Sequence, residues 1–293
     1  MKILITGSSG TLANSVFTTK NLNRYKLFGV DKKESNNTQY LVDISNFVQL
    51  RKIFTEIHPK IIFHFASETN VDLCETDKLN AILNNFVTTK NLVDIIKTLN
   101  IPIVFTSTAS IFDGKKNFPY KEEDKPSPCN FYALTKHLSE EYIKTNLSKY
   151  FIFRFGWLVG NPKIDQKFFG KIKLKLKDNG SKLFGVNDQF GSLTFADEFS
   201  DLLFKIINTN YFGTYHFASE GNTSRYQIIS EILKYKSLSK SVSLENKELK
   251  YFNLTAQRPQ NEILDIQKVK DLGIHKIKNW KDDLKNYLEK YDF

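Results

Sequence analysis

The chain opens with MKILITGSSGTLA (residues 1–13), in which a short apolar run passes directly into a loop of small residues. The run KILIT predicts a buried β-strand. Gly7, Gly10 and Ala13 follow at three-residue spacing and lead into a helix-compatible stretch. Small residues at this spacing allow a phosphate pair to approach backbone N–H groups at a helix N-terminus. The stretch therefore predicts the strand, glycine loop and helix of a dinucleotide-binding unit.

Further apolar runs repeat this alternation along the first half of the chain. The predicted strands are KLFGV (26–30), KIIFHFA (60–66), IPIVFTS (101–107) and FIFRF (151–155). Helical stripes of apolar residues lie between them, at Phe47, Leu50, Ile53, Phe54 and Ile57 and at Leu79, Ile82, Leu83, Phe86, Val93 and Ile96. The strands are mostly too apolar for burial on one face only. Strands buried on both faces with helical crossovers indicate an α/β fold with a Rossmann doubly wound parallel sheet, whose ligands lie beyond the carboxyl ends of the strands.

The pattern loosens after residue 156, where helical stretches at 196–208 and 224–235 are separated by turn-rich segments. We expect residues 1–155 to form an NAD(P)-binding Rossmann domain. Residues 156–293 should form mainly a smaller substrate-binding lobe, with one return crossing to the sheet near 193–217.

Composition is that of a globular protein, with 41% hydrophobic and 14% aromatic residues, which argues against a disordered or fibrous chain. A net charge of +10 raises the question of nucleic acid. The lysines are spread along the whole chain, so we expect no nucleic-acid partner. The densest run, KIKLKLK (171–177), alternates as a strand would, whereas Phe168, Ile172 and Leu176 recur as in a helix. A solvated face is the preferred interpretation of this run.

The N-terminal apolar run has only four residues before the glycine turn, which is too short for a signal peptide, and no segment resembles a membrane span. These features predict a soluble, cytoplasmic protein. Cys74 and Cys129 share no CxxC spacing, so both are expected to be free thiols, and no metal site is predicted.

The second predicted strand ends in Asp31. A carboxylate at this place can accept hydrogen bonds from the adenosine ribose hydroxyls and repels a 2′-phosphate, which favours NAD. Lys32 and Lys33 follow immediately and could hold a 2′-phosphate, so NADP stays open.

Two further features suggest proton transfer. The strand at 101–107 ends in the hydroxyl-rich stretch TSTASIFDG (106–114), and YALTK (132–136) opens a helical stretch that continues to about Thr145. Tyr132 and Lys136 then lie one helical turn apart on one face. A nearby ammonium can lower the phenol pKa by roughly 1 to 3 units from its usual value of about 10. The pair is therefore a candidate general acid or base.

A glycine loop after the first strand, a strand ending near Thr108 and a YxxxK pair, in this order, are typical of the short-chain dehydrogenase/reductase superfamily. Over nearly its whole length the chain resembles the dTDP-4-dehydrorhamnose reductase type of the extended branch. The resemblance rests on MKILITGSSG, LVDISN (41–46), HFASETNVDLCE (64–75), STASIFDG, PYKEEDKPSP, YALTK, RFGWLVG (154–160), NDQFGSLTFADEF (187–199), GTYHFASEGNTSRYQI (213–228) and QRPQNEILD (257–265). NDQFG and QRPQN are the fragments most specific to the reductase type.

The resemblance implies roles for individual residues. Thr108 would hydrogen-bond the substrate C4 oxygen, Tyr132 would exchange a proton with it, and Lys136 would hold the nicotinamide ribose and depress the tyrosine pKa. The residues implied to bind the cofactor are Gly7, Gly10, Thr11 and Leu12 around the pyrophosphate, Asp43 and Ile44 beside the adenine, and Ala66, Ser67 and Asn85 along the cofactor cleft. The residues implied to bind the substrate are Ser110, Trp157 against the sugar and Arg258 near the nucleotide. Asn85 and Trp157 have equally good alternative interpretations as a buried hydrogen-bonding residue and a core aromatic.

Departures from the family pattern bear on the substrate. The third glycine of the loop is Ala13, and Val159 stands where a Tyr is common. The family usually has Thr-Asp-Tyr after the strand, whereas here Thr108-Ala109-Ser110 is similar to the Ser-Ala-Thr of UDP-galactose 4-epimerases and related dehydratases.

The resemblance implies an NAD(P)-dependent oxidoreductase that reduces the C4 keto group of a nucleotide-linked 4-keto-6-deoxy sugar. One alternative is a nucleotide-sugar 4-epimerase or dehydratase with bound NAD. Another is a non-catalytic, cofactor-binding regulatory subunit, because the regulatory subunit of methionine adenosyltransferase resembles this family. The expected partner is the nucleotide sugar, and homodimerisation, the identity of the sugar and nucleotide, and the C4 stereochemistry are left open.

Overall fold

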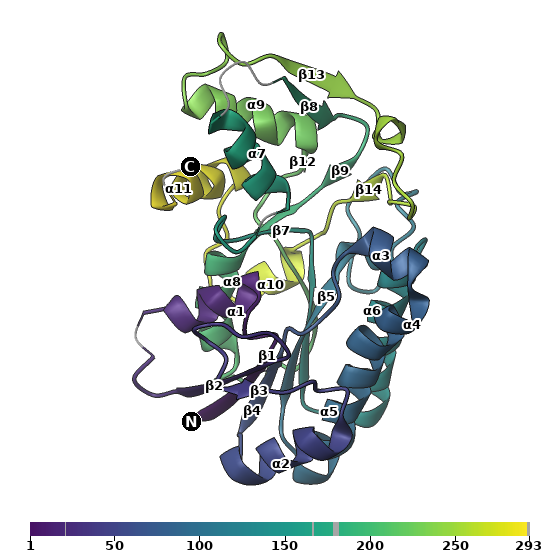
Figure 1. The fold of residues 1–293 in the computed structure, drawn as a ribbon, viewed down its shortest axis with the longest axis vertical. Helices are drawn as coiled ribbons and strands as arrows, with labels where there is room; N and C mark the ends of the chain where they lie inside the picture. The colour runs from purple at the N-terminus through teal and green to yellow at the C-terminus, as the bar shows by residue number, and fades with distance from the viewer. Residues whose placement is uncertain (21, 166, 178–181, 292–293) are drawn as a thin grey trace.

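The structure, a computed structural model, describes residues 1–20, 22–165, 167–177 and 182–291. Figure 1 shows a lower part built on a sheet with helices on both sides, and a smaller upper part in which α7, α9 and α11 lie around short strands. The lower part has the doubly wound α/β architecture, so the predicted fold class is confirmed.

The main sheet contains seven strands in the order β11-β6-β5-β4-β1-β2-β3. Its strands are β1 (Lys2–Thr6), β2 (Lys26–Asp31), β3 (Tyr40–Leu41), β4 (Ile61–His64), β5 (Ile103–Thr108), β6 (Tyr150–Phe155) and β11 (Gly213–Phe217). Every neighbouring pair runs parallel. The chain starts at β1, moves outward to β3 and then crosses over to β4, so the strand order reverses between β1 and β4. In such a sheet, the crevice for a ligand opens at the carboxyl ends of these two strands.

The five strands predicted from apolar runs are all present, and their burial explains the sequence pattern. In β1, Ile3 and Ile5 face one hydrophobic core while Leu4 faces the other, and all three are fully buried. Successive side chains of a strand point to opposite faces, so a strand covered on both faces must be apolar throughout. Complete burial of one such side chain contributes about 1.5–3 kcal/mol to the free energy of unfolding.

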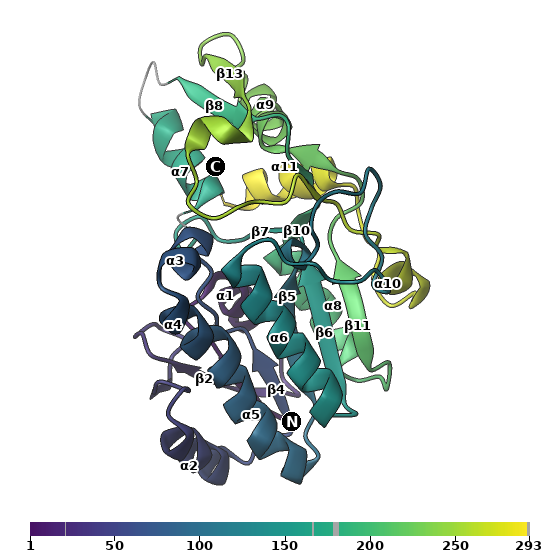
Figure 2. The same cartoon turned by 90° about the vertical axis from the view of Figure 1, so that its right-hand side faces the viewer.

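Helices cover both faces of the sheet, as Figure 2 shows from the side. The helices on one face are α2 (Phe47–Ile57), α5 (Thr88–Leu99) and α6 (Phe131–Asn146). Those on the other face are α1 (Thr11–Thr18), α8 (Ala196–Ile206) and α10 (Gln267–Asp271). None of the helices formed by the described residues is both long enough and apolar enough to cross a lipid bilayer.

The helix predicted from the apolar stripe over residues 79–96 is present, but it is not α-helical throughout. The chain forms α3 (Val71–Thr76), α4 (Lys78–Ala81), a π-helical turn η1 (Ile82–Val87) and then α5. Leu79 and Leu83 are exposed, whereas Val93 and Ile96 are buried. The wider π turn changes the phase of the helix between these two pairs, so one stripe cannot face the core throughout.

The upper part has its own hydrophobic core, which includes Trp157, Phe169, Ile228 and Trp280. Its strands are β7 (Trp157–Val159) with β10 (Leu193–Phe195), β9 (Phe190–Gly191) between β12 (Thr223–Ser224) and β14 (Asn261–Glu262), and β8 (Leu183–Val186) with β13 (Leu244–Lys247). Its helices are α7 (Phe168–Lys177), α9 (Arg225–Tyr235) and α11 (Trp280–Lys290). Two 3₁₀ turns, η2 (Ala109–Ile111) and η3 (Leu249–Phe252), complete the described elements.

The lysine run at 171–177 belongs to α7, so the helical interpretation of this ambiguous stretch is the right one. Phe169 and Ile172 are buried, and Lys171, Lys175 and Lys177 are exposed. The run therefore forms the solvated side of an amphipathic helix.

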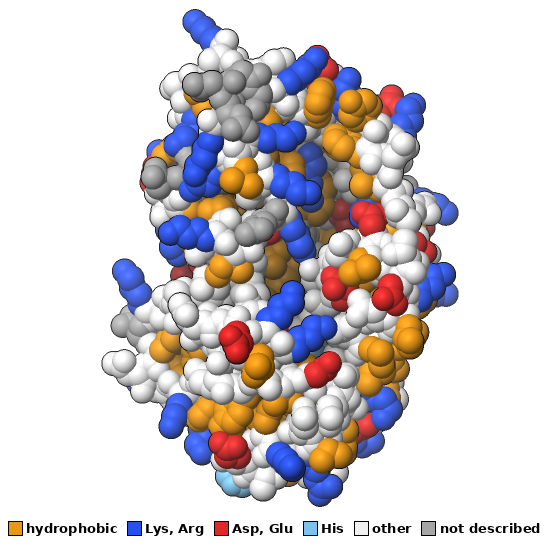
Figure 3. Space-filling view, in the orientation of Figure 1, with side chains coloured by type: hydrophobic (Ala, Val, Ile, Leu, Met, Phe, Trp, Pro, Cys, Tyr) orange, Lys and Arg blue, Asp and Glu red, His pale blue; other side chains and the backbone are white. Residues whose placement is uncertain are grey.

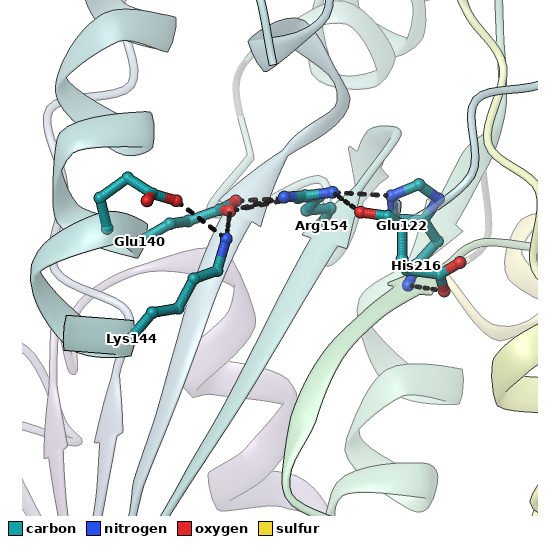
Figure 4. Close-up of polar contacts among 6 residues, drawn as sticks. Glu122, Glu140, Lys144, Arg154 and His216 are labelled. Atoms are coloured by element: carbon teal, nitrogen blue, oxygen red, sulfur yellow. Dashed lines mark hydrogen bonds and ion pairs between the residues drawn. The ribbon is translucent and has the colours of Figure 1, made fainter. Parts of the chain in front are cut away.

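A buried ion pair joins α6 to the sheet. Arg154 of β6 donates from Nε to Glu140 Oε1 (3.0 Å) and from Nη2 to Glu140 Oε2 (2.8 Å). Figure 4 shows the same guanidinium extending to Glu122, whose backbone oxygen accepts from Nη1 at 3.0 Å, and to His216. Lys144 lies 3.2 Å from Glu140 Oε2 at the outer edge of this network. Burial alone would raise the pKa of Glu140, but the hydrogen bonds and charge of Arg154 lower it to about 2.

We predict that Arg154→Met lowers the free energy of unfolding by about 3–5 kcal/mol, because it leaves the Glu140 carboxylate buried without its partner. Urea denaturation at pH 7 measures this loss, and the double variant Glu140→Met/Arg154→Met, which removes both charges, should recover a large part of it. A loss below about 1 kcal/mol for the single variant would show that the pair does not stabilise the protein.

The same pair makes a pH-dependent contribution. The folded-state pKa of Glu140 is about 2 and the ordinary value is 4.5, so this contribution is present above pH 4.5 and is lost as the pH falls toward 2. The stability difference between wild type and Arg154→Met should therefore narrow over this range. Denaturation midpoints measured at several pH values test this, and a difference that stays constant would contradict it.

Candidate active site

The glycine loop forms a cradle between β1 and β4. Gly7 has φ +72°, and a Cβ at this position would lie 2.6 Å from the backbone nitrogen of Ala66, so a side chain does not fit. Gly10 is the N-cap of α1, and the first backbone hydrogen bond of that helix joins Asn14 N to Gly10 O (3.0 Å). The N–H groups of Thr11 and Leu12 therefore lie at the open N-terminus of α1, where a pyrophosphate can accept from them.

Asp31 ends β2 beside this loop. Its Oδ2 accepts from the backbone nitrogen of Ser9 (2.9 Å) and from the Ser9 hydroxyl (2.8 Å), and its Oδ1 accepts from Lys33 N (3.0 Å). Lys32 turns away to donate to Asn84 Oδ1 (2.6 Å), while the Lys33 side chain is exposed. The structure thus fixes the Asp31 carboxylate at the end of β2, and its contact with a ribose stays a prediction.

Asp43 and Ile44 follow β3, the outermost strand on this side. Asp43 is exposed and Ile44 is buried, and the backbone oxygen of Ile44 accepts from Asn91 Nδ2 (3.2 Å). Their position beyond a strand carboxyl end fits the implied adenine contact, which stays a prediction.

Asn85 links three elements. Its Oδ1 accepts from Glu68 N (2.7 Å) and from the Ser67 hydroxyl (2.9 Å), while its Nδ2 donates to Glu68 O (3.2 Å) and to Thr135 Oγ1 (2.9 Å). These four contacts use the full hydrogen-bonding capacity of an amide side chain. The π turn η1 carries this residue, and its contacts fix the loop after β4, including Ala66 and Ser67, against α6. The structure thus gives Asn85 a positioning role, in line with the interpretation as a buried hydrogen-bonding residue.

Thr108 and Tyr132 lie together at the end of β5. Thr108 is the last residue of that strand, and its hydroxyl accepts from Ser110 N (3.2 Å). Burial raises the pKa of the Tyr132 phenol, nearby Cys74 raises it further, and a hydrogen bond with the Thr108 side chain lowers it. The net shift is upward, against the lowered pKa expected from the YxxxK spacing, because desolvation dominates at this position.

Lys136 is buried one turn further along α6, with its ammonium 4.2 Å from the ring centroid of Phe105. Burial lowers its pKa to about 7, although Glu140 and Cys74 favour the charged form. Lys136 thus lies close to the Glu140 carboxylate, whose negative charge partly offsets the cost of burying the ammonium.

Cys74 is a residue of this region that the sequence did not place near the chemistry. It is a free, fully buried thiol on α3, and it donates to Glu68 O across 3.7 Å. Burial raises its pKa to about 11. Cys74 lies close enough to Tyr132 and Lys136 to affect the pKa of both. This proximity depends on the packing of α3 against α6, which the fragment HFASETNVDLCE does not reveal.

The sugar-side residues meet at a buried carboxylate that sequence reasoning also missed. The Ser110 hydroxyl donates to Glu262 Oε1, and Trp157 Nε1 (2.8 Å) and Gln189 Nε2 (3.2 Å) donate to Glu262 Oε2. Ser110 and Trp157 are therefore brought together, through Glu262 rather than by direct contact. Gln189 belongs to the fragment NDQFG and Glu262 to QRPQNE. The specificity of these two fragments to the reductase type was the one signal in the sequence that could have pointed to Glu262.

Arg258 lies apart from this cluster. Its Nη2 donates to Asp72 Oδ2 on α3 (2.9 Å), and its Nη1 donates to Ala256 O (2.8 Å). Asp72 also accepts from Ala256 N at 2.8 Å. Arg258 thus ties the segment before β14 to the lower part, and its contact with a nucleotide stays a prediction.

The family described as the RmlD substrate binding domain matches residues 1–293. The chain is 27% identical to the spore coat polysaccharide biosynthesis protein SpsK of Bacillus subtilis, over 98% of this chain and 97% of that protein. It is similar to the crystal structure of a dTDP-4-dehydrorhamnose reductase from Clostridium acetobutylicum, with 27% identity, full coverage of both chains and a TM-score of 0.90. It is also similar to a dTDP-4-dehydrorhamnose reductase of Bacillus anthracis in complex with NADP, with 27% identity, 99% coverage of both chains and a TM-score of 0.88.

We predict that Lys136→Met stabilises the protein while removing a functional group. The folded-state pKa of Lys136, about 7, lies below the ordinary 10.5, so the cost of burying its charge is largest below pH 7 and vanishes above 10.5. The variant should therefore unfold with a free energy roughly 1–4 kcal/mol higher at pH 6, and with a smaller excess at pH 9. Urea denaturation at both pH values checks this, and a variant less stable than wild type at pH 6 would refute it.

Proposed function

The chain belongs to the RmlD substrate binding domain family. We propose that it is an NAD(P)-dependent reductase of a nucleotide-linked keto sugar. The reaction adds a hydride and a proton across the C4 carbonyl of a 4-keto-6-deoxy sugar. The observation that carries the proposal is that Thr108, Tyr132 and Lys136 lie together at the carboxyl end of the sheet, beside the glycine cradle.

The two hydroxyls supply the acid chemistry. A raised pKa keeps the Tyr132 phenol protonated at neutral pH, so it can donate its proton to the oxygen that becomes negative as the carbonyl is reduced. The Thr108 hydroxyl is hydrogen-bonded to the same phenol, and its single proton can be donated instead to the substrate oxygen when the carbonyl lies between the two hydroxyls. The Lys136 ammonium lies one turn along α6. Its positive charge can stabilise the phenolate that forms as Tyr132 gives up its proton.

The cofactor residues fit a dinucleotide. Gly7 packs against the backbone of Ala66, where a Cβ would not fit, and the open N-terminus of α1 follows directly, as a pyrophosphate requires. Gly7, Gly10, Thr11 and Leu12 would hold the pyrophosphate, and Lys136 the nicotinamide ribose. Held by these residues, a reduced nicotinamide would supply the hydride that the substrate carbonyl takes up.

NADH is the proposed electron donor. The Asp31 carboxylate is fixed at the end of β2 by Ser9, and its charge would repel a 2′-phosphate. Lys32, the residue that could offset this charge, is engaged with Asn84. The NADP complex of the Bacillus anthracis relative shows that the other cofactor can bind within the family, so preference here depends on these local contacts.

The remaining features of the proposal concern organisation. Residues 1–155 would bind the cofactor, and residues 156–293 would mainly bind the sugar, with the return of the chain into the sheet at β11. Homodimerisation, a cytoplasmic location and the absence of a nucleic-acid partner stay predictions.

Two alternative functions can be separated from a reductase. An epimerase or dehydratase would retain NAD through purification, and a regulatory subunit would keep its cellular role without Tyr132.

We predict that Tyr132→Phe lowers kcat about 10²- to 10⁴-fold, because it removes the proton donor and preserves the ring. Oxidation of NADH followed at 340 nm, with dTDP-linked and UDP-linked 4-keto-6-deoxy sugars, measures the effect. Thr108→Val should lower kcat by a smaller factor, about 10-fold or more.

Tyr142→Phe is the matched control, since Tyr142 lies on the same helix and its hydroxyl donates to Asp94 (2.7 Å) away from the site. Its kcat should equal that of wild type. Wild-type activity in Tyr132→Phe, in protein that binds NADH normally, would overturn the assignment.

We also predict that wild type has a lower KM for NADH than for NADPH, and that Asp31→Ala reverses or removes this preference. The carboxylate would no longer repel the 2′-phosphate, and Lys33 could approach it. Steady-state kinetics with both cofactors check this, and a preference for NADPH in the wild type would contradict it.

A further inference from the structure

Arg225, the first residue of α9, is held between two aromatic rings. Its guanidinium carbon lies 3.9 Å from the ring centroid of Trp157 and 4.5 Å from that of Phe168. A stacked guanidinium keeps its N–H donors in its plane, so they remain available at its edge. The stacking therefore fixes the orientation of the arginine without using its hydrogen bonds.

No hydrogen bond or ion pair joins this guanidinium to another residue within the part of the chain that the structure describes. The two carboxylates that interact with it by charge, Glu262 and Asp165, are engaged elsewhere: Glu262 by three donors, and Asp165 by Lys167 N at 3.2 Å. Arg154 and Arg258, by contrast, each have a carboxylate partner at hydrogen-bond distance. Burial lowers the pKa of Arg225 to about 10, so the side chain still carries its charge at neutral pH.

Contacts connect Arg225 to the reacting groups. Ser110, two residues after Thr108, donates to Glu262, and Glu262 accepts from the indole of Trp157. That indole then stacks on Arg225. Figure 3 shows a hollow between the upper and lower parts, with Lys and Arg side chains around it. Arg225 thus belongs to the wall of the cleft in which the sugar would lie.

Trp157 has little surface left for a ligand. It is 8% exposed, and a Cβ at Gly191 would lie 2.8 Å from its Cε2, so the backbone of Gly191 packs directly against the ring. Arg225 covers the ring as well. A ligand that approaches this wall therefore meets the arginine edge before the tryptophan face.

We infer that Arg225 binds a phosphate of the diphosphate of the nucleotide-sugar substrate. This inference rests on the proposed function, because it takes the nucleotide sugar as the ligand. The planar fork of a guanidinium matches two oxygens of a phosphate or carboxylate and forms charge-assisted hydrogen bonds with them. Lys167, whose Nζ donates to Thr69 Oγ1 across the cleft (2.6 Å), adds positive charge at the same wall.

Binding measured by isothermal titration calorimetry, without turnover, tests the inference. We expect Arg225→Met to bind dTDP or UDP about 10- to 100-fold more weakly than wild type, and to bind thymidine or uridine equally well. Arg225→Lys, which keeps the charge and loses the fork, should show a smaller loss. Lys234→Met is the matched control, since Lys234 is an exposed residue of the same helix paired only with Glu231 in the described chain, and it should bind like wild type.

A further ligand tests whether the diphosphate is the contacted group. Arg225→Met should bind UDP-glucose more weakly than wild type by the same factor as UDP, because both ligands carry the diphosphate. Affinities equal to wild type for all these ligands would overturn the inference while leaving the reductase function intact. Failure of the wild type to bind any nucleoside diphosphate would overturn both, because no nucleotide sugar could then be the substrate.

Discussion

The four-residue spacing of Tyr132, Lys136 and Glu140 on α6 is the constraint on which the site depends. This spacing places all three side chains on one helix face, directed at the sheet. Glu140 binds Arg154 in the core, Lys136 lies over Phe105, and Tyr132 reaches Thr108 at the end of β5. The buried ion pair thus sets the height of the helix against the sheet, and the position of the phenol follows from it.

The parallel sheet provides the second half of this arrangement. Because β1, β2, β4 and β5 all end at the same edge, the glycine cradle, Asp31 and Thr108 meet there although they are distant in sequence. Asn85 then joins the loop after β4 to α6 with its complete set of hydrogen bonds. In the proposed function, the lower part therefore supplies the cofactor edge and the acid, and the upper part selects the substrate.

Local signals predicted the lower part well and the upper part poorly, for a physical reason. Continuous apolar runs report burial on both faces, and YxxxK reports a helix face, so β1, β5 and the Tyr132 pair could be recognised from short windows. The carboxylate at Glu262 could not, because its partner Ser110 is 152 residues away. The phase change at η1 was missed since apolar periodicity does not reveal one wide turn. The raised pKa of Tyr132 depends on burial, which the spacing of two residues does not report.

One difference from the family pattern contacts the upper part. Ser110 stands where the family usually has a Tyr, and it donates to Glu262 beside Trp157 and Arg225. In the proposed function, Thr108 and Tyr132 thus keep their roles while the residues beside the sugar differ from the family pattern. The most direct test of the central claim uses NADH that carries deuterium at both hydrogens of the nicotinamide C4. Mass spectrometry then follows the deuterium into a 4-keto-6-deoxy nucleotide sugar. A reductase transfers one deuterium to C4 of the sugar in each turnover. A converted sugar without label, or no transfer to any such sugar by protein that binds NADH, would contradict the account.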